Sequence, residues 1–208
     1  YFDAAGCGGV PFVTAYLGLR RAGAELRGQV VVVMGANGKV GQAAVQLAAA
    51  AGARVIAVQR AAALQGWASA PVDVVDTREG QVGLRVRDLS GGRGADIVFN
   101  TVGSAYFEAA NTALAKGGTQ ILIATTERAV PFDIFAFYRG MHSYVGIDTL
   151  ALDAVATSER LDAMRAGFDA GLLRAYPVDD DAVFGLGDAA QAYRQVLAGA
   201  TRRIVLRP

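Results

Sequence analysis

The feature that most constrains the fold is an apolar run that leads into a glycine-spaced turn and then an alanine-rich helix. The run is Val30–Met34, and glycines follow at Gly35, Gly38 and Gly41. A strand that ends, turns within about two residues and starts a helix needs glycine where the backbone comes close to other atoms. Because the first amide groups of such a helix point outward, the spacing predicts a turn that holds the phosphates of a dinucleotide.

The charges and the segments around this turn favour that prediction, although a tight connection can also use glycine for steric reasons alone. Lys39 lies at the start of the predicted helix, where a cation is unfavourable unless an anion is nearby, and the first turn contains no acid. Val40–Ala51 is uncharged and rich in small side chains, Gly52 suits a helix end, and Arg54–Val58 predicts a second strand. Together these segments predict a βαβ unit.

Strands and helices are expected to alternate along the rest of the chain. A lead-in helix is predicted over 12–26, immediately before the first strand. Later strands are predicted at Asp73–Asp76, Asp96–Asn100, Thr119–Ala124 and Tyr144–Ile147. Such alternation is typical of an α/β protein with a doubly wound parallel sheet, which is a Rossmann fold with three α/β/α layers.

The C-terminal region has a different rhythm. The expected elements there are a helix at 152–173, an extended segment at 178–184, a helix at 188–197 and a strand at 204–206. No low-complexity linker or charge block marks a second boundary. We therefore expect residues 1–208 to form one nucleotide-binding domain, with a lead-in helix in 1–28 and a short strand-helix-strand appendage at about 175–208.

Composition narrows the classes of partner. The chain has 20 basic and 19 acidic residues, which favours small molecules over nucleic acid or an anionic membrane. It has no signal-like segment and no apolar span near 20 residues, so a cytoplasmic location is the default expectation. Cys7 and His142 are the only residues of their types, so no Cys/His zinc site is expected in this chain, and Cys7 is interpreted as a buried structural thiol.

The end of the second predicted strand bears on the choice of dinucleotide. In this architecture an acid about 20 residues after the glycines accepts hydrogen bonds from the adenosine ribose and selects NAD. No acid occurs from Arg54 to Gly66, and Gln59 and Arg60 stand where it would be. A guanidinium there can pair with a 2′-phosphate, so NADP(H) is preferred over NAD(H). The alternative for Arg60 is an ordinary solvated side chain at a strand end.

Aromatic residues are concentrated in the segment from Pro131 to Tyr144. They are Phe132, Phe135, Phe137, Tyr138 and Tyr144. Such a group can line a pocket for a flat or apolar molecule, or it can simply pack as core.

Motifs distributed along the chain resemble the medium-chain dehydrogenase/reductase superfamily, in its zinc-independent branch similar to quinone oxidoreductases. They are Thr14–Leu19, Gly35–Ala48, Arg54–Val58, Asp96–Gly103, Gly117–Thr119, Asp188–Tyr193 and Ile204–Leu206. A departure occurs at Arg202-Arg203, where many members have Gly-Lys. The resemblance covers essentially all 208 residues.

The resemblance implies a set of cofactor-binding positions. These are Thr14, Gly35, Ala36, Asn37, Gly38, Lys39, Val40, Gly41, Arg60, Val102, Ala124 and Thr125. Asn37 to Val40 match the pyrophosphate turn and Arg60 matches the 2′-phosphate position. Thr14, Val102, Ala124 and Thr125 match places near the ribose and nicotinamide. The alternatives are a hydroxyl that bonds its own helix for Thr14 and core packing for Val102.

The resemblance also implies an activity and a larger protein. A GroES-like catalytic domain would precede Tyr1, the appendage at about 175–208 would lean on it, and the catalytic residues would lie mainly there, so none is assigned here. The expected activity is hydride transfer between NADPH and a quinone, enone or other carbonyl substrate. The alternatives are an enoyl-thioester reductase, a zinc-dependent alcohol dehydrogenase and a non-catalytic nucleotide-binding module.

Members of the superfamily pair their sixth strands into one continuous sheet. The matching segment here is Ser143–Asp148. Because an unpaired apolar edge is a liability that pairing removes, we expect a homodimer through this strand.

Overall fold

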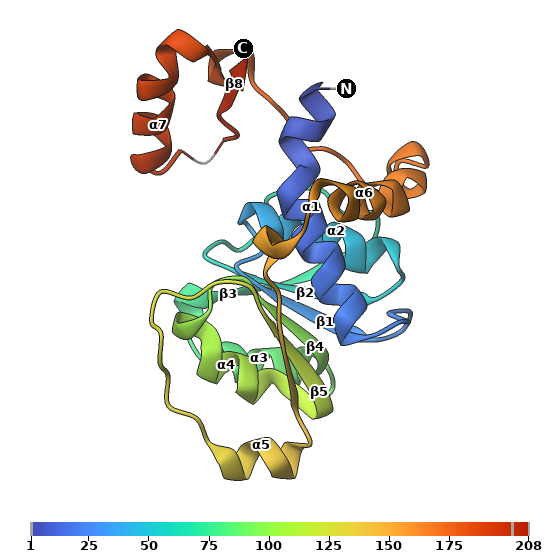
Figure 1. Ribbon diagram of the computed structural model, residues 1–208. Coiled ribbons are helices and arrows are strands. Elements are labelled where there is room, and N and C mark those ends of the chain that lie inside the picture. The colour runs from blue at the N-terminus through green and yellow to red at the C-terminus, as the bar shows by residue number, and fades with distance from the viewer. Residues whose placement is uncertain (1, 201, 208) are drawn as a thin grey trace. The chain divides into compact units, whose positions relative to one another are not determined.

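The apolar runs of the sequence form a six-stranded parallel sheet in the order β3-β2-β1-β4-β5-β6 (Figure 1). The strands are β1 Val30–Met34, β2 Arg54–Gln59, β3 Val72–Asp76, β4 Ala95–Asn100, β5 Leu114–Leu122 and β6 Ser143–Gly146. Strands are added outward from β1 on one side and from β4 on the other, which is the order of the Rossmann fold. The predicted fold class is therefore confirmed.

The computed structural model describes the backbone of residues 2–200 and 202–207 and the side chains of residues 8–200 and 202–207. The chain divides into two compact units, of which Val10–Leu173 contains the six-stranded sheet. The other unit combines Tyr1–Gly9 with Arg174–Pro208.

Helices cover both faces of the sheet, with α1 and α2 on one side and α3 and α4 on the other (Figure 1). The helices of this part of the chain are α1 Phe2–Ala22, α2 Lys39–Ala50, α3 Val82–Leu89, α4 Phe107–Ala113, α5 Ile134–Gly140 and α6 Ala154–Asp169. β1 is buried along its whole length, as expected of a central strand that is covered on both faces.

Each face of the sheet has its own core. Under α3 and α4, the core includes Val32, Met34 and Val98, all fully buried. On the opposite face α1 lies so close that a methyl group on Gly18 would lie 2.6 Å from the ring of Phe99. Phe12 of α1 is also fully buried. This packing holds the carboxyl ends of the strands in fixed positions.

Several element bounds differ from the predicted ones for local reasons. The lead-in helix ends at Ala22 rather than Leu26, because the Gly23 amide donates to the Leu19 carbonyl and closes the last turn. β5 begins at Leu114 rather than Thr119, since its pairing with β4 shifts register at a bulge. α6 begins after Asp153, whose carboxylate accepts a hydrogen bond from the Ala156 amide.

The second unit contains a two-stranded parallel sheet and one helix. Its elements are β7 Val183–Gly185, α7 Ala189–Leu197 and β8 Val205–Arg207. The segment predicted as extended over 178–184 contains a single 3₁₀ turn, Asp180–Ala182, before β7 begins. Asp181 in this turn forms an ion pair with Arg202, 2.5 Å apart.

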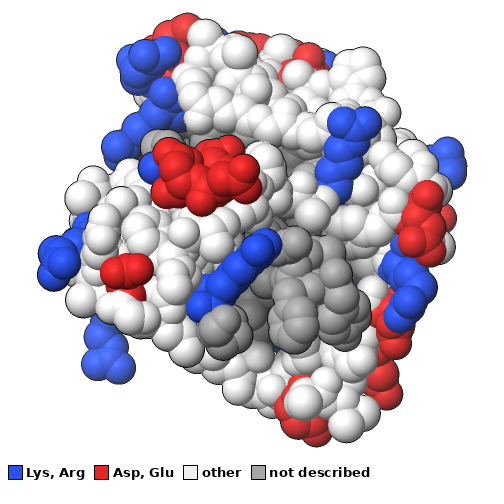
Figure 2. All heavy atoms as spheres, turned by 90° about the horizontal axis from the view of Figure 1, so that it is seen from above, with Lys and Arg blue, Asp and Glu red and all other residues white. Residues whose placement is uncertain are grey.

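On the face in Figure 2, basic and acidic side chains are interspersed among uncharged ones. Among the described residues, no helix is both long and apolar enough to cross a membrane.

Candidate functional site

The turn after β1 is too crowded for side chains at two of its glycines. Gly35 has φ +78°, and a methyl group there would lie 2.8 Å from Val102 Cγ2. A methyl group on Gly41 would lie 2.8 Å from Ala36 Cα and closer still to the Gly35 carbonyl oxygen. Real Cβ atoms essentially never make such contacts, so glycine is required at both positions. The close approach brings the start of α2 directly against the turn.

The start of α2 is open to an anion. Gly38 is the N-cap residue, no side chain caps the helix, and its first turn contains no acid. A helix leaves the amides of its first turn without intrahelical acceptors, and these amides carry the positive end of the helix dipole. Beside them, the buried Asn37 Oδ1 has no hydrogen-bond partner among the described residues. The site therefore offers both donors and an unused acceptor.

Asn100, at the end of β4, fixes the next turn along the same edge. Its Oδ1 accepts from the amides of Val102 and Gly103, at 3.1 and 2.8 Å, while its Nδ2 donates to the Gly103 carbonyl at 2.9 Å. Gly103 has φ +85°, and a methyl group there would lie 2.5 Å from Thr125 Cα. Val102 and Thr125 are thus held on neighbouring turns.

The same asparagine begins a chain of buried hydrogen bonds. Asn100 Nδ2 also donates to Gln120 Oε1 at 3.2 Å, and Gln120 Nε2 donates to Asn111 Oδ1 at 2.7 Å. The Tyr144 hydroxyl donates to the same Asn111 oxygen at 2.9 Å. Asn100 and Gln120 are fully buried. Buried polar groups that are satisfied in this way rigidify the segments they join, here β4, β5, α4 and β6.

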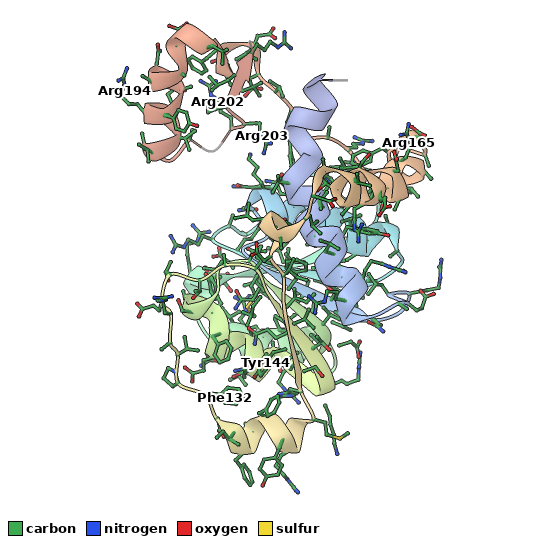
Figure 3. All side chains as sticks on the ribbon, viewed as in Figure 1. Phe132, Tyr144, Arg165, Arg194, Arg202 and Arg203 are labelled. Atoms are coloured by element: carbon green, nitrogen blue, oxygen red, sulfur yellow. The ribbon has the colours of Figure 1, made fainter. Side chains whose placement is uncertain are left out.

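The aromatic segment forms its own cluster and lines a cavity of about 640 Å³. Phe137 stacks on Tyr144, with ring centroids 5.5 Å apart, and Phe132 meets Tyr144 edge-on at 5.7 Å. Figure 3 labels Phe132 and Tyr144 in this part of the molecule. His142 also lines the cavity, and burial lowers its pKa. Both interpretations of the segment are thus visible: the rings pack on one another, and they form a wall.

A second cavity, of about 340 Å³, adjoins the turn after β4. Gly103, Ala124 and Thr125 line it, and it shares Phe107 with the aromatic cavity. Two of the residues predicted to lie near the ribose and nicotinamide, Ala124 and Thr125, therefore border an open volume.

The end of β2 carries no acid. Gln59 is buried, its Nε2 donates to the Ala63 carbonyl at 2.5 Å, and its Oε1 has no partner among the described residues. Arg60 follows as an exposed side chain that forms no ion pair within the described part of the chain.

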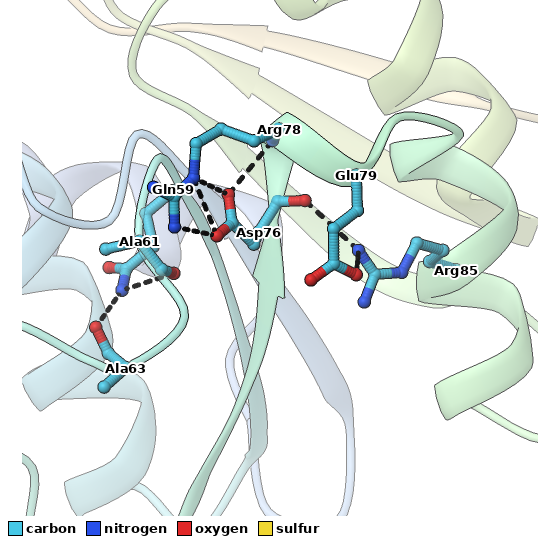
Figure 4. Close-up of polar contacts among 7 residues, drawn as sticks. All are labelled: Gln59, Ala61, Ala63, Asp76, Arg78, Glu79 and Arg85. Atoms are coloured by element: carbon cyan, nitrogen blue, oxygen red, sulfur yellow. Dashed lines mark hydrogen bonds and ion pairs between the residues drawn. The ribbon is translucent and has the colours of Figure 1, made fainter.

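Sequence reasoning missed a charged pair on the neighbouring strand. Asp76, the last residue of β3, is paired with Gln59 in the sheet register and binds Arg78 (Figure 4). Hydrogen bonds from the Arg78 side chain lower the pKa of the Asp76 carboxyl. The sequence signal was an Asp-x-Arg at a predicted strand end, but nothing in it showed that β3 lies beside β2.

Thr14 is the predicted cofactor residue with the clearest contacts inside the protein. Its hydroxyl donates to the Val10 carbonyl one turn earlier, at 2.8 Å, as the alternative interpretation expected. It also lies 3.2 Å from the Thr149 hydroxyl. Thr14 therefore links α1 to the segment after β6.

Within the described residues, no group of three or more His, Cys, Asp or Glu side chains is placed to hold a metal ion. The Cys7 side chain lies outside the described side chains, so its predicted burial is not addressed.

Comparison with known proteins places these features in a family. Residues 40–163 match the family model described as zinc-binding dehydrogenase. The chain is 33% identical over 175 residues to a zinc-type alcohol dehydrogenase-like protein of Schizosaccharomyces pombe, covering 82% of this chain and 50% of the relative. It is 31% identical over 160 residues to acryloyl-coenzyme A reductase of Sulfurisphaera tokodaii, covering 74% and 44%.

Two further similarities extend over nearly the whole chain. Human quinone oxidoreductase is 26% identical over 207 residues, covering 95% of this chain and 60% of that protein. The solved structure of an NAD-dependent alcohol dehydrogenase superposes with a TM-score of 0.81 at 26% identity, covering all of this chain and 59% of that one. The chain thus spans about half the length of these three curated relatives. It belongs to the zinc-binding dehydrogenase family, within the medium-chain dehydrogenase/reductase superfamily.

Proposed function

We propose that the carboxyl edge of the sheet binds NADP(H), in a protein that transfers hydride between NADPH and a quinone, enone or other carbonyl substrate. One observation carries the proposal: the crowded turn at Gly35 and Gly41 sets an uncapped helix start beside the unsatisfied Asn37 Oδ1. Ligands of doubly wound sheets bind outside the carboxyl ends of the strands, where the strand order reverses, here between β1 and β4.

The residues of the turn fit a pyrophosphate group. Amides in the first turn of α2, such as that of Val40, would donate to its oxygens, and Lys39 adds a positive charge to the same region. Asn37 Oδ1 would accept a hydrogen bond from a ligand hydroxyl, which would explain why a buried acceptor is left unpaired.

The residues after β4 and β5 would position the nicotinamide end. The bound cofactor supplies a hydride, which is chemistry that no side chain provides. Val102, Ala124 and Thr125 would form one wall of the nicotinamide site, and Asn100 holds the first of these turns in place. Thr14 would lie near the ribose and nicotinamide. The remaining substrate wall and any proton donor are proposed to come from residues outside this sequence.

The preference for NADP(H) is supported by charge. With Gln59 in the position of the NAD-selecting acid and Arg60 exposed beside it, a 2′-phosphate meets no carboxylate at the end of β2. Among the similar solved structures, one holds NADPH and another is described as NAD-dependent, so the family accommodates both cofactors.

Isothermal titration calorimetry of the chain with NADPH and NADH tests the proposal. We expect both to bind, with NADPH binding more tightly by about tenfold, because one charge-assisted contact to the 2′-phosphate is worth about 1.5 kcal/mol. Binding of neither cofactor would contradict the proposal, and tighter binding of NADH would contradict the preference.

Enoyl-thioester reduction is the second candidate function. The similarity to acryloyl-coenzyme A reductase supports it, as does a 26% identical match to a highly reducing polyketide synthase of Aureobasidium melanogenum. Steady-state assays of the protein with its flanking sequences, using a quinone and an enoyl-coenzyme A in parallel, distinguish the two. A larger kcat/KM for the quinone supports the first candidate, and a larger kcat/KM for the thioester supports the second.

We also propose that two copies pair through β6 and its continuation to Asp148. β6 is an edge strand of the sheet, and the preceding helix α5 exposes apolar side chains at Ile134, Phe135 and Tyr138. Exposed edges and apolar patches of this kind mark association surfaces. Light scattering at micromolar concentration should report a dimer, and a monomer would contradict this part of the proposal.

A further inference from the structure

A charged pair at the end of β3 lies beside the position at which doubly wound folds select their dinucleotide. We propose that Arg78, oriented by Asp76, binds the 2′-phosphate of NADP(H) and that the pair acts as a selector between the two cofactors. The inference rests on the proposed dinucleotide function and assigns to Arg78 a role that the sequence analysis predicts only for Arg60.

The sheet register brings the pair to this position. Gln59 of β2 and Asp76 of β3 are register partners, and neighbouring strands lie about 4.8 Å apart. Partners in adjacent parallel strands project from the same face, so the Asp76 carboxylate lies next to the side chain that occupies the acid position. Figure 4 shows Gln59, Asp76 and Arg78 together at the ends of the two strands.

The contacts of Arg78 orient its guanidinium and leave part of it available. Nε donates to both Asp76 oxygens at 3.0 Å, and Nη2 donates to Oδ2 at 2.5 Å. The Arg78 amide also donates to Asp76 Oδ1 at 3.0 Å, which fixes the carboxylate. Nη1 has no acceptor among the described residues, and the Arg78 side chain is 65% exposed. A planar guanidinium bound along one edge still presents donors on its other edge, as a phosphate requires.

The carboxylate has a second effect on selectivity. Asp76 is 4% exposed, and both of its oxygens accept hydrogen bonds from Arg78. While the pair is intact, Asp76 is not free to accept from the ribose hydroxyls as the acid of an NAD-binding protein does. If Arg78 is removed, an unpaired carboxylate remains beside the ribose site. It would repel a 2′-phosphate and accept from a free 2′-hydroxyl.

The other charged side chains near the Asp76–Arg78 pair do not oppose the binding of a phosphate by Arg78. Glu79, the nearest other acid in the chain, is paired with Arg85 at 2.6 Å, and the same Arg85 Nη1 donates to the Asp76 carbonyl at 3.1 Å. Arg60 lies at the end of the neighbouring strand, exposed. Two arginines that follow adjacent strands would therefore share the phosphate.

The test compares two ligands that differ only in the 2′-phosphate, adenosine 2′,5′-bisphosphate and adenosine 5′-monophosphate, by calorimetric titration of the chain. In Arg78→Gln we expect the affinity for the bisphosphate to fall by about tenfold or more, while affinity for the monophosphate is unchanged or rises. In the double variant Asp76→Asn/Arg78→Gln, part of the lost bisphosphate affinity should return, because the freed carboxylate is gone. Arg93→Gln is the matched control, since Arg93 forms a similar pair with Asp96 at the opposite edge of the sheet.

The outcomes separate this inference from the proposed function. If wild type binds NADPH but Arg78→Gln leaves the ratio of the two affinities unchanged, the selector is overturned and the proposed function stands. If wild type binds neither NADPH nor the two adenosine ligands, both are overturned. If circular dichroism shows that Arg78→Gln does not fold, Arg78→Lys is tested instead. It keeps a cation beside Asp76 but lacks the planar guanidinium that binds a phosphate through two nitrogens. We expect its affinity ratio to fall by about threefold, and an unchanged ratio overturns the selector.

Discussion

Polar side chains at the amino ends of the strands (the amino edge) and at their carboxyl ends (the carboxyl edge) differ in whether they have hydrogen-bond partners. At the amino edge, Asp96 accepts from both terminal nitrogens of Arg93, at 2.5 and 2.7 Å, and from the Val30 amide at 2.8 Å. At the carboxyl edge, Asn37 Oδ1 and Gln59 Oε1 are the two buried side-chain atoms of the described residues that have no partner. The Asp96 carboxylate at the amino edge is thus fully bonded, whereas two buried oxygens at the carboxyl edge have no partner among the described residues.

This difference indicates where a ligand completes the structure. Buried polar atoms without partners are rare in proteins, and each calls for a physical reason. Asn37 lies in the turn after β1 and Gln59 is the last residue of β2, and both are next to residues that the resemblance assigns to the cofactor. The neighbouring turn after β4 is fully bonded through Asn100, so the edge combines a rigid frame with unused hydrogen-bonding groups.

The largest effect on this difference between the two edges is expected from a side chain added at a crowded glycine of the turn after β1. In Gly41→Ala, the added methyl group would overlap the Gly35 carbonyl oxygen and approach Ala36 Cα to 2.8 Å. Displacing the turn should weaken NADPH binding by about 100-fold and reduce the free energy of unfolding by about 1–3 kcal/mol. Calorimetric titration and urea unfolding measure the two effects.

Gly187→Ala is the control for this change, since a methyl group there has no atom within 4 Å. It should leave both quantities nearly unaltered. Equal effects of the two substitutions would show that crowding at Gly41 has no special role.

The rigid part of the carboxyl edge is tested by Asn100→Ala. The substitution leaves the amides of Val102 and Gly103 and the side chain of Gln120 without their partner in a fully buried site. We expect the free energy of unfolding to fall by about 2–4 kcal/mol, because several unsatisfied groups remain. Urea unfolding measures this, and a loss below about 0.5 kcal/mol would contradict the network.

A substitution at Tyr144, the far end of the hydrogen-bond network, should reduce the free energy of unfolding by less than Asn100→Ala does. Tyr144→Phe removes one hydrogen bond to Asn111 but keeps the ring that stacks on Phe137. We expect a loss of about 0.5–1.5 kcal/mol by urea unfolding. A double-mutant cycle with Asn100→Ala tests the connection, and strict additivity would mean that the two ends act independently.

Much of the sheet could be predicted, because its signals are local. β2 and β4 were placed to within one residue, since runs such as Arg54–Val58 and Asp96–Asn100 are rich in β-branched side chains bounded by glycine or polar turns. The glycine turn was recognised for the same reason, as its spacing lies within seven consecutive residues.

The missed features depend on contacts between distant residues. Asn100 and Gln120 meet only because β4 pairs with β5, and Asp76 meets Gln59 only because β3 is added beside β2. α5 was not predicted either, because the aromatic residues around it gave no clear helical period. Charge and hydrogen-bond partners were thus harder to predict than the positions of the strands in the sequence.

The smallest predicted effect is the contribution of Asp96, at the amino edge, to the pH dependence of the free energy of unfolding. The side-chain hydrogen bond from Arg93 lowers the pKa of Asp96 below its ordinary value. A carboxyl whose pKa is lowered in the folded state stabilises the fold at pH values above its unfolded pKa of about 3.9. That contribution is lost as the pH falls through the folded pKa.

Urea unfolding of wild type and Asp96→Asn from pH 7 to pH 2 measures this contribution. We expect a difference of at most about 1 kcal/mol at pH 7, because the pair is partly exposed, and convergence of the two proteins at low pH. A gap that widens on acidification would reverse the sign of the proposed contribution.

The most direct test of the account is a titration of the ¹⁵N-labelled chain with NADPH, followed by amide NMR shifts. If the carboxyl edge is the cofactor site, the largest changes should fall on the amides from Asn37 to Gly41 and on those of Val102 and Gly103. The amides around Asp96 at the opposite edge should barely move. Saturable binding with its largest changes at the amino edge, or no change at the glycine turn, would contradict the central claim.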